Sequence, residues 1–266
     1  MGLTVSGHRI RVMVLGMLVS GIGLPVDVSA QETDLDAVRQ QAINVDFSFV
    51  NTTGNTDTTT TSFGAGYLAQ RGRWGFGVEG KHMQFDFGEV TAAESSDVKF
   101  HGSRVLNQRL ALLVIGGWER DIFKGLDARY VGGGGLLAQL VRLPRWALAA
   151  TGAAGWTRET LTLSPLASDF LTLFGEVDST IGLSQTASFT QTLTVRPGFQ
   201  SANSELGRED ATDLLIDFEM ALQSAVNSWL SVVLQYTVDH DTEPAFGKEQ
   251  TDQNVTASLR LGWSRQ

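Results

Sequence analysis

Apolar and polar residues alternate along most of the chain, beginning with Ile43-Asn44-Val45-Asp46-Phe47-Ser48-Phe49. Successive side chains of a β-strand point to opposite faces, so this period of two predicts a strand with one apolar and one polar face. The pattern recurs, and it predicts twelve strands that start near Ile43, Phe63, Trp74, Val98, Leu110, Leu126, Trp146, Leu171, Phe189, Leu214, Leu230 and Val255. Helical periodicity is almost absent apart from a short piece within residues 32–41. An all-β meander is therefore the expected fold class.

The connections between these strands alternate in length. The even-numbered ones are short, at residues 71–73, 106–109, 142–145, 184–188 and 224–228. The odd-numbered ones are mostly longer and more polar, at residues 88–97, 121–125, 161–169, 201–210 and 241–250. Outer-membrane barrels have tight turns at one end and longer loops at the other. The sequence therefore predicts an antiparallel up-and-down transmembrane β-barrel of about twelve strands, with short periplasmic turns and longer extracellular loops.

Charged side chains fall mainly on the face opposite the large apolar ones. A lipid-facing apolar exterior around a charged lumen is the pattern of a membrane barrel, inverted relative to a soluble barrel. The expected lumen charge network consists of Asp46, Glu79, Lys81, Glu119, Asp127, Arg129, Arg158, Glu176, Asp178, Arg196, Asp217, Glu219 and Arg260. Interior ion pairing is the favoured interpretation for each of them, ahead of a binding or catalytic role.

Aromatic residues fall near the expected strand ends, as a membrane-interface girdle requires. They are Trp74, Trp118, Tyr130, Trp146, Trp156, Phe170, Phe189, Trp229 and Trp263. The last strand alternates strictly and finishes on an aromatic residue, which resembles the C-terminal signal read by the barrel-insertion machinery. Its apolar positions are Val255, Ala257, Leu259, Leu261 and Trp263, followed by three further residues.

The N-terminus has the features of a secretory signal. His8, Arg9 and Arg11 precede an apolar run to Leu24, and Val28-Ser29-Ala30 offers small residues for cleavage. We therefore expect residues 1–30 to be a cleaved signal peptide, 31–41 a short periplasmic segment and 42–266 the barrel. The chain has a net charge of −9 and no cysteine. This excludes a disulfide framework and argues against a nucleic-acid partner, which needs a basic face.

Catalytic chemistry has only weak candidates. Asp239 and His240 lie at the expected outer end of one strand, where a histidine beside a carboxylate can activate water. The alternation puts Asp239 inward and His240 on the lipid side, which opposes this interpretation. His82, Asp86 and His101 form a second loose cluster on neighbouring strands. Polar positions at the loop rim explain both groups equally well.

Metal and cofactor motifs are missing. The sequence has no thiolates, no H-E-x-x-H helix and no G-x-S-x-G elbow, so no metal site and no cofactor are expected. Acidic loop residues lack the ordered spacing of a calcium-binding loop. The run Gly132–Gly135 lacks the Lys and Ser/Thr of a phosphate-binding loop and instead continues a strand. We expect inward side chains such as Glu119, Arg129 or Arg158 to lie across these glycines.

The chain resembles the salt-induced outer-membrane protein family, bacterial barrels of unknown function. The resemblance spans roughly the region after the signal and is carried by residues 53–56, 74–79, 118–121, 155–159 and 252–263. It implies an outer-membrane location and a link to salt or osmotic stress, and it supplies no catalytic residues. The expected partners are outer-membrane lipid, lipopolysaccharide and the insertion machinery.

The expected function is that of a structural or stress-responsive envelope barrel, with a narrow polar pore as one form of it. Two alternatives stay open: an outer-membrane hydrolase acting on lipid or peptide near Asp239 and His240, and a soluble periplasmic β-protein.

Overall fold

The computed structural model describes residues 39–52, 58–87, 90–122, 124–162, 164–199, 212–242 and 249–265. Twelve strands account for nearly all of them: β1 Arg39–Thr52, β2 Thr58–Arg71, β3 Trp74–Phe87, β4 Val90–Val105, β5 Leu110–Asp121, β6 Leu126–Leu143, β7 Trp146–Leu161, β8 Ser164–Gly182, β9 Ala187–Phe199, β10 Thr212–Ala225, β11 Leu230–Asp241 and β12 Thr251–Arg265. The prediction of twelve strands is confirmed. No helix in the described residues is long and apolar enough to cross a membrane. The expected signal peptide lies outside the described residues.

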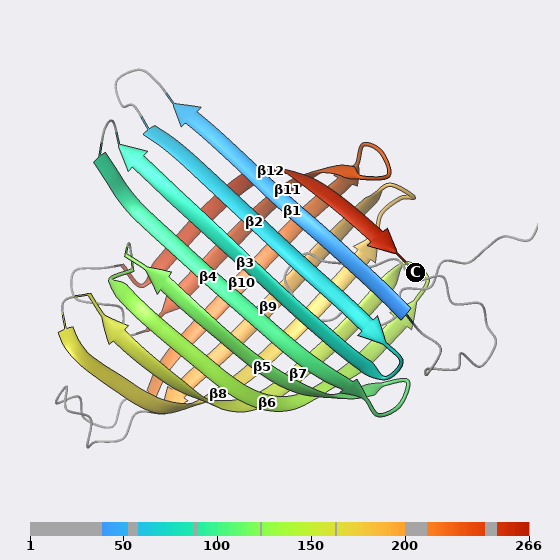
Figure 1. Ribbon diagram of the computed structural model, residues 1–266, viewed down its shortest axis with the longest axis horizontal. Helices are drawn as coiled ribbons and strands as arrows, with labels where there is room; N and C mark the ends of the chain where they lie inside the picture. Colours follow the sequence, from blue (N-terminus) through green and yellow to red (C-terminus); the bar gives the residue numbers. More distant parts are fainter. Residues whose placement is uncertain are drawn as a thin grey trace, which may run out of the picture.

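Every strand pairs antiparallel with its neighbours in the sequence, and β1 closes the barrel by pairing with β12 (Figure 1). The closing register sets Ile43 opposite Trp263 and Phe47 opposite Leu259, which joins apolar exterior positions of the two strands. Closure gives every strand two partners and leaves no open sheet edge. The predicted up-and-down transmembrane topology is therefore confirmed as a closed antiparallel barrel.

The two ends of the barrel differ. At the short-turn end, tight turns join β2 to β3, β4 to β5, β6 to β7, β8 to β9 and β10 to β11, and β1 starts and β12 ends there. Gly72 has a φ of 59° in the first of these turns, a conformation that glycine adopts at little cost. Asn107 and Asn227 stabilise two others, because each side-chain oxygen accepts two backbone N–H groups, such as those of Arg109 and Leu110. The opposite end is called the long-loop end here.

Two of the expected long loops are shorter than the sequence suggested. The structure leaves only residues 88–89 between β3 and β4 and residues 162–163 between β7 and β8. Residues 90–97 and 164–169, expected to be loop, instead extend β4 and β8. Polar residues such as Thr91, Ser95 and Ser96 keep their backbones paired across the hairpin, so polarity alone did not mark the end of the strand.

The outward face is apolar. Large exposed hydrophobic side chains surround the barrel, and Val255, Phe47 and Leu259 are between 50% and 67% exposed. Tryptophans concentrate in one belt near the short-turn end, formed by Trp74, Trp146, Trp229 and Trp263. Phe170 was expected in the girdle, but it faces the lumen and is 4% exposed. A contiguous apolar surface of this size marks contact with lipid.

The glycine run in β6 allows two backbones to approach closely. A Cβ on Gly133 would lie 2.6 Å from the Ala154 backbone oxygen, and one on Gly135 would lie 2.1 Å from that of Gly152. The expectation of a bulky side chain over these glycines was wrong for this site, because the nearest atoms belong to β7 itself. Glycine therefore serves a tight bend of the β6–β7 wall, visible as its curvature in Figure 1.

Candidate functional site: the charged lumen

The inward face of the barrel carries charged side chains of both signs. By register and alternation, its carboxylates are Asp46, Glu79, Asp97, Glu119, Glu159, Glu176, Asp178, Asp217, Glu219 and Asp239. Its cations are Lys81, Lys99, Arg129, Arg196 and Arg260. The carboxylates outnumber the cations, so the lumen is acidic.

Two expected members of the lumen network face outward. Arg158 pairs in register with exposed Tyr130, and its Nη1 lies 3.9 Å from Asp169 with the arginine side chain 61% exposed. Asp127 sits in a β-bulge next to Leu126, where the register shifts. The extra residue turns its side chain outward to within 3.9 Å of Arg120 Nε. A bulge reverses the alternation locally, and the sequence pattern does not show it.

Arg129 forms the most buried charge cluster. Its Nη2 donates to Glu159 Oε2 over 2.7 Å, its Nε donates to the same oxygen over 2.9 Å, and its Nη1 donates to Glu119 Oε2 over 3.3 Å. The arginine side chain is 9% exposed and that of Glu159 is 11% exposed. These residues come from β5, β6 and β7, so the cluster ties three neighbouring strands together.

Two further arginines are paired in the lumen. Arg196 on β9 donates to Asp217 on β10 over 2.5 Å. Arg260 on β12 donates twice to Asp46 on β1, over 2.6 and 3.0 Å, and once to Gln223 on β10 over 3.2 Å. The second of these groups bridges the strands that close the barrel. All three lumen arginines therefore have carboxylate partners.

Five described lumen carboxylates have no such partner. Asp97 is one of them, and together we call the other four the acidic collar: Glu79, Glu176, Asp178 and Glu219. Among the described residues, none of them has a cationic nitrogen within 4.0 Å. Thr194 donates to Glu176 over 3.0 Å and Thr192 donates to Asp178 over 2.8 Å. Glu79 on β3 and Glu219 on β10 stand on opposite walls of the barrel, and Lys99 lies opposite Glu79 in register. The collar is thus a band of carboxylates around an acidic passage.

A lysine crosses the mouth at the long-loop end. Lys124 lies in the turn between β5 and β6, and its Nζ donates over 3.0 Å to Asp239 Oδ2 on β11, on the opposite side of the barrel. The backbone N–H of Lys124 donates to Asp121 Oδ1 over 3.0 Å, which anchors the turn. Burial opposes the ammonium, yet Asp239, Glu119 and Asp121 raise the pKa of Lys124 above its usual value. The Lys124 side chain, which we call the strap because it crosses the mouth, therefore stays charged at neutral pH.

The short-turn end of the lumen is lined differently. Several of its inward side chains are large and apolar, and Leu68, Leu113, Leu137 and Val233 are between 0% and 5% exposed. Leu113 and Leu137 pack with Ala111 in one cluster. We call these four large residues the apolar layer. An inward side chain with almost no exposure has no water beside it, so this layer narrows the passage that the acidic collar surrounds.

Water-accessible space remains along the β3–β4 wall. Lys81 and Lys99 point into the barrel and are nevertheless exposed. In register, Lys81 pairs with Asp97 and Lys99 pairs with Glu79. A charged side chain that is exposed inside a closed barrel borders hydrated lumen, so the long-loop half can hold water and ions.

The catalytic candidates are not brought together. His240 lies on the outward face with its Nδ1 2.8 Å from Thr251 Oγ1, while Asp239 faces the lumen and binds Lys124. His82 faces outward, with its Nδ1 2.8 Å from Ser96 Oγ. The side chain of Asp86 shares that face by alternation and accepts from Gln84.

His101, the third member of that group, points into the lumen and is 5% exposed, on the opposite face of the sheet from His82. Within the described ranges, no three His, Cys, Asp or Glu residues are grouped to hold a metal ion.

The lumen charge network predicted from the sequence did not include four charged residues: Asp97, Lys99, Glu159 and Lys124. Strict alternation places Asp97 and Lys99 on the face of His101, so that signal was present but was not followed through the expected loop at residues 88–97. Lys124 had no signal, because a turn residue reaches the opposite wall only in the closed barrel.

A solved outer-membrane channel shares the fold of this chain. The COG4313 outer membrane channel from Pseudomonas putida F1 matches with a TM-score of 0.53 at 10% identity, covering 89% of this chain and 100% of that one. The NanC porin has a TM-score of 0.46 at 10% identity, covering 85% and 98%. The translocator domain of the autotransporter NalP from Neisseria meningitidis has a TM-score of 0.43 at 12% identity, covering 86% of this chain and 88% of that one. At such identities the likeness extends to the fold alone.

No curated protein matches the sequence. A family model described as "Protein of unknown function, DUF481" matches residues 45–263. The expectation of a barrel family of unknown function is thereby confirmed, and its salt-induced character stays a prediction. The chain belongs to the DUF481 family.

Proposed function

We propose that this protein spans the outer membrane of a Gram-negative cell and forms a narrow polar pore that prefers cations. The observation that carries the proposal is the acidic collar, because rings of unpaired carboxylates select cations in membrane pores. The apolar outward face and the tryptophan belt support insertion in a membrane. Export by a cleaved signal in residues 1–30, with residues 31–41 leading into the barrel, is part of the same proposal.

Planar-bilayer recordings of the refolded protein in a KCl gradient test the pore. We expect small conductance steps whose reversal potential has the sign of cation preference. The double variant Glu176→Gln/Asp178→Asn removes two collar charges and should move the reversal potential toward zero. Asp127→Asn is the matched control, because Asp127 is exposed outside the lumen and its neutralisation should leave selectivity unchanged. Anion-selective steps would contradict the proposal.

The apolar layer supports a second candidate, a closed structural barrel of the envelope. Leu137 is fully buried in that layer, so Leu137→Ala should widen the passage and enlarge the conductance if a pore exists. An absence of steps in both the native protein and Leu137→Ala would favour the closed barrel instead. Heat-modifiable mobility on gels checks that each variant is folded.

A role in salt or osmotic stress extends the proposal and rests on the family resemblance. A strain that lacks the gene should grow more slowly than its parent at raised NaCl and should recover with the native gene. Equal growth of the two strains would remove this part of the proposal and leave the pore untouched.

A further inference from the structure

All charged side chains around the five short turns are positive. The turns, together with two strand residues on either side of each, contain no Asp, Glu or Lys and these arginines: Arg71, Arg73, Arg104, Arg109, Arg142 and Arg145. Near the opposite end both signs occur on the outer surface, with Asp86, Glu94 and Asp169 beside Arg120 and Arg158. The outer surface of the barrel thus carries a charge asymmetry, with an anion-attracting zone at the short-turn end.

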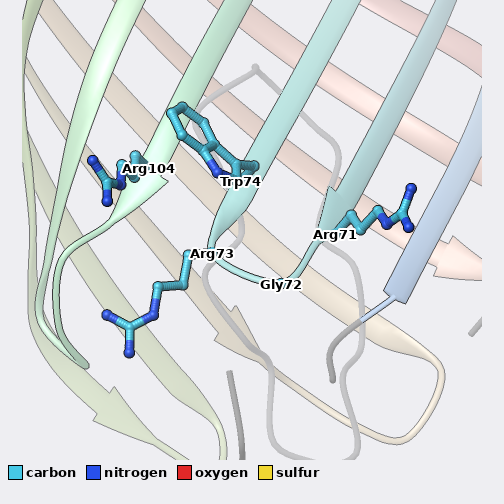
Figure 2. A pocket seen from close by; sticks show the side chains of 5 residues that line it. All are labelled: Arg71, Gly72, Arg73, Trp74 and Arg104. Atoms are coloured by element: carbon cyan, nitrogen blue, oxygen red, sulfur yellow. The ribbon is translucent and has the colours of Figure 1, made fainter. Parts of the chain in front are cut away.

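Three of the six arginines surround one tryptophan. Trp74 pairs in register with Arg71 and Arg104, and Arg73 lies in the turn before it. The Arg104 guanidinium carbon is 5.3 Å from the centre of the Trp74 ring system, which is a cation–π contact. Figure 2 shows Arg73 and Arg104 on the Trp74 side of the turn and Arg71 on its other flank. These residues and Gly72 line an open hollow of about 440 Å³.

An uncovered apolar gap lies at Gly102 on the outer surface near this hollow, and we call it the Gly102 groove. Gly102 lies on the outward face two residues before Arg104 and opposite Phe76, and a Cβ added to it would meet nothing within 4 Å. Phe100 and Phe76 flank this gap and are 46% and 47% exposed. The Phe100 ring covers Gly116 on β5, where an added Cβ would clash with it at 2.0 Å. The gap at Gly102 is therefore left uncovered beside two lipid-facing rings.

We propose that this arginine–tryptophan hollow and the Gly102 groove bind one anionic phospholipid of the leaflet at the short-turn end. Arginine guanidinium groups bind phosphate through paired N–H donors. The phosphate sits against Arg73 and Arg104, and Arg71 adds positive charge on the other flank of the turn. Trp74 lies at the headgroup level, and an acyl chain follows the groove past Phe76 and Phe100. The inference rests on the membrane-spanning part of the proposed function and not on the pore.

Native mass spectrometry of the full barrel in mixed micelles tests the site, with phosphatidylglycerol and phosphatidylcholine as probes. We expect retention of phosphatidylglycerol to exceed that of phosphatidylcholine by about tenfold or more. The variant Arg71→Ala/Arg73→Ala/Arg104→Ala should abolish that preference. The control Arg120→Ala/Arg158→Ala removes two outward arginines at the long-loop end and should keep it.

A second variant tests the groove separately from the charges. Gly102→Leu fills open space and should not disturb folding, yet it should weaken phosphatidylglycerol retention because the chain groove is blocked. Glycerol phosphate at the same concentration should fail to displace the lipid.

Full displacement by glycerol phosphate would overturn the proposal, because it would indicate a site for free anions. A preference for lipopolysaccharide or equal retention of the two phospholipids would overturn it as well. So would lipid retention that neither the triple variant nor Gly102→Leu changes. Collar variants should keep the lipid whether or not the barrel conducts, so this test and the pore test fail independently.

Discussion

The Arg129 cluster and the acidic collar both place carboxylates in the same lumen, yet only the cluster supplies them with a cation. Glu119 and Glu159 share one buried arginine at 3.3 and 2.7 Å. Glu176 and Asp178 have only threonine hydroxyls as donors at these distances. Burial of a carboxylate without a counter-charge is expensive, so carboxylates of the second kind do not stabilise the fold as the Arg129 cluster does.

This difference distinguishes a cluster that stabilises the fold from a group of carboxylates with a candidate function. The Arg129 cluster joins three adjacent strands at the sharply curved β5–β7 wall, which fits a role in stability. The collar carboxylates have no cationic nitrogen within 4.0 Å among the described residues, which fits a role toward passing cations. Each of the following substitutions tests this contrast.

The largest effect is expected for Arg129→Met. The change leaves the nearly buried Glu159 and the half-buried Glu119 without their arginine, which should lower the free energy of unfolding by about 3–5 kcal/mol. Urea unfolding of the barrel in lipid vesicles, followed by tryptophan fluorescence, measures it. Arg129→Lys keeps the positive charge and should lower the free energy of unfolding by less. A loss below about 1 kcal/mol for Arg129→Met would mean that the cluster is not structural.

The collar double variant Glu176→Gln/Asp178→Asn should change the free energy of unfolding in the opposite direction from Arg129→Met. Removal of like charges on one strand face should raise the free energy of unfolding by about 0.5–1 kcal/mol. The same urea experiment measures it, alongside the loss of cation preference in bilayers. A clear drop in stability would show that the two carboxylates have partners that stabilise the fold.

Lys124→Ala tests the ion pair between Lys124 and Asp239, whose side chains are partly exposed. The side chains of Lys124 and Asp239 are 32% and 38% exposed, so removal of the strap should cost only about 0.5–1 kcal/mol. Because the strap crosses the mouth, the single-channel conductance should rise. Lys124→Arg preserves the charge and serves as the control. An unchanged conductance would place the limiting constriction at the apolar layer.

The smallest effect is expected for Arg158→Ala. Its ion pair with Asp169 spans 3.9 Å on an exposed surface, so the free energy of unfolding should change by less than about 0.5 kcal/mol. Selectivity should not change either, since Arg158 lies outside the lumen. A shift of reversal potential in this variant would indicate that outer-surface charges influence conduction.

Much of the candidate site could be predicted from alternation alone. Asp46, Glu79, Arg196 and Arg260 face the lumen as their parity requires, because a strand sends successive side chains to opposite faces. Asp127 escaped the prediction because its bulge shifts that parity.

The other errors have different origins. Arg158 was assigned inward although its own register partner, Tyr130, was predicted to face lipid. The His82 group was assembled from neighbouring strands without regard to face, and His101 belongs to the other side of the sheet.

The sequence by itself determined the strand count, the apolar exterior and most of the inward charges, since each depends on local periodicity. Only the tertiary structure decided which charges are paired, because partners such as Lys124 and Asp239 are 115 residues apart and meet through closure of the barrel. The tertiary structure likewise decided that Gly133 and Gly135 of β6 accommodate the β7 backbone, and that three arginines and a tryptophan line one hollow. Pairing across a lumen depends on strand order and curvature, and a pattern of period two carries neither.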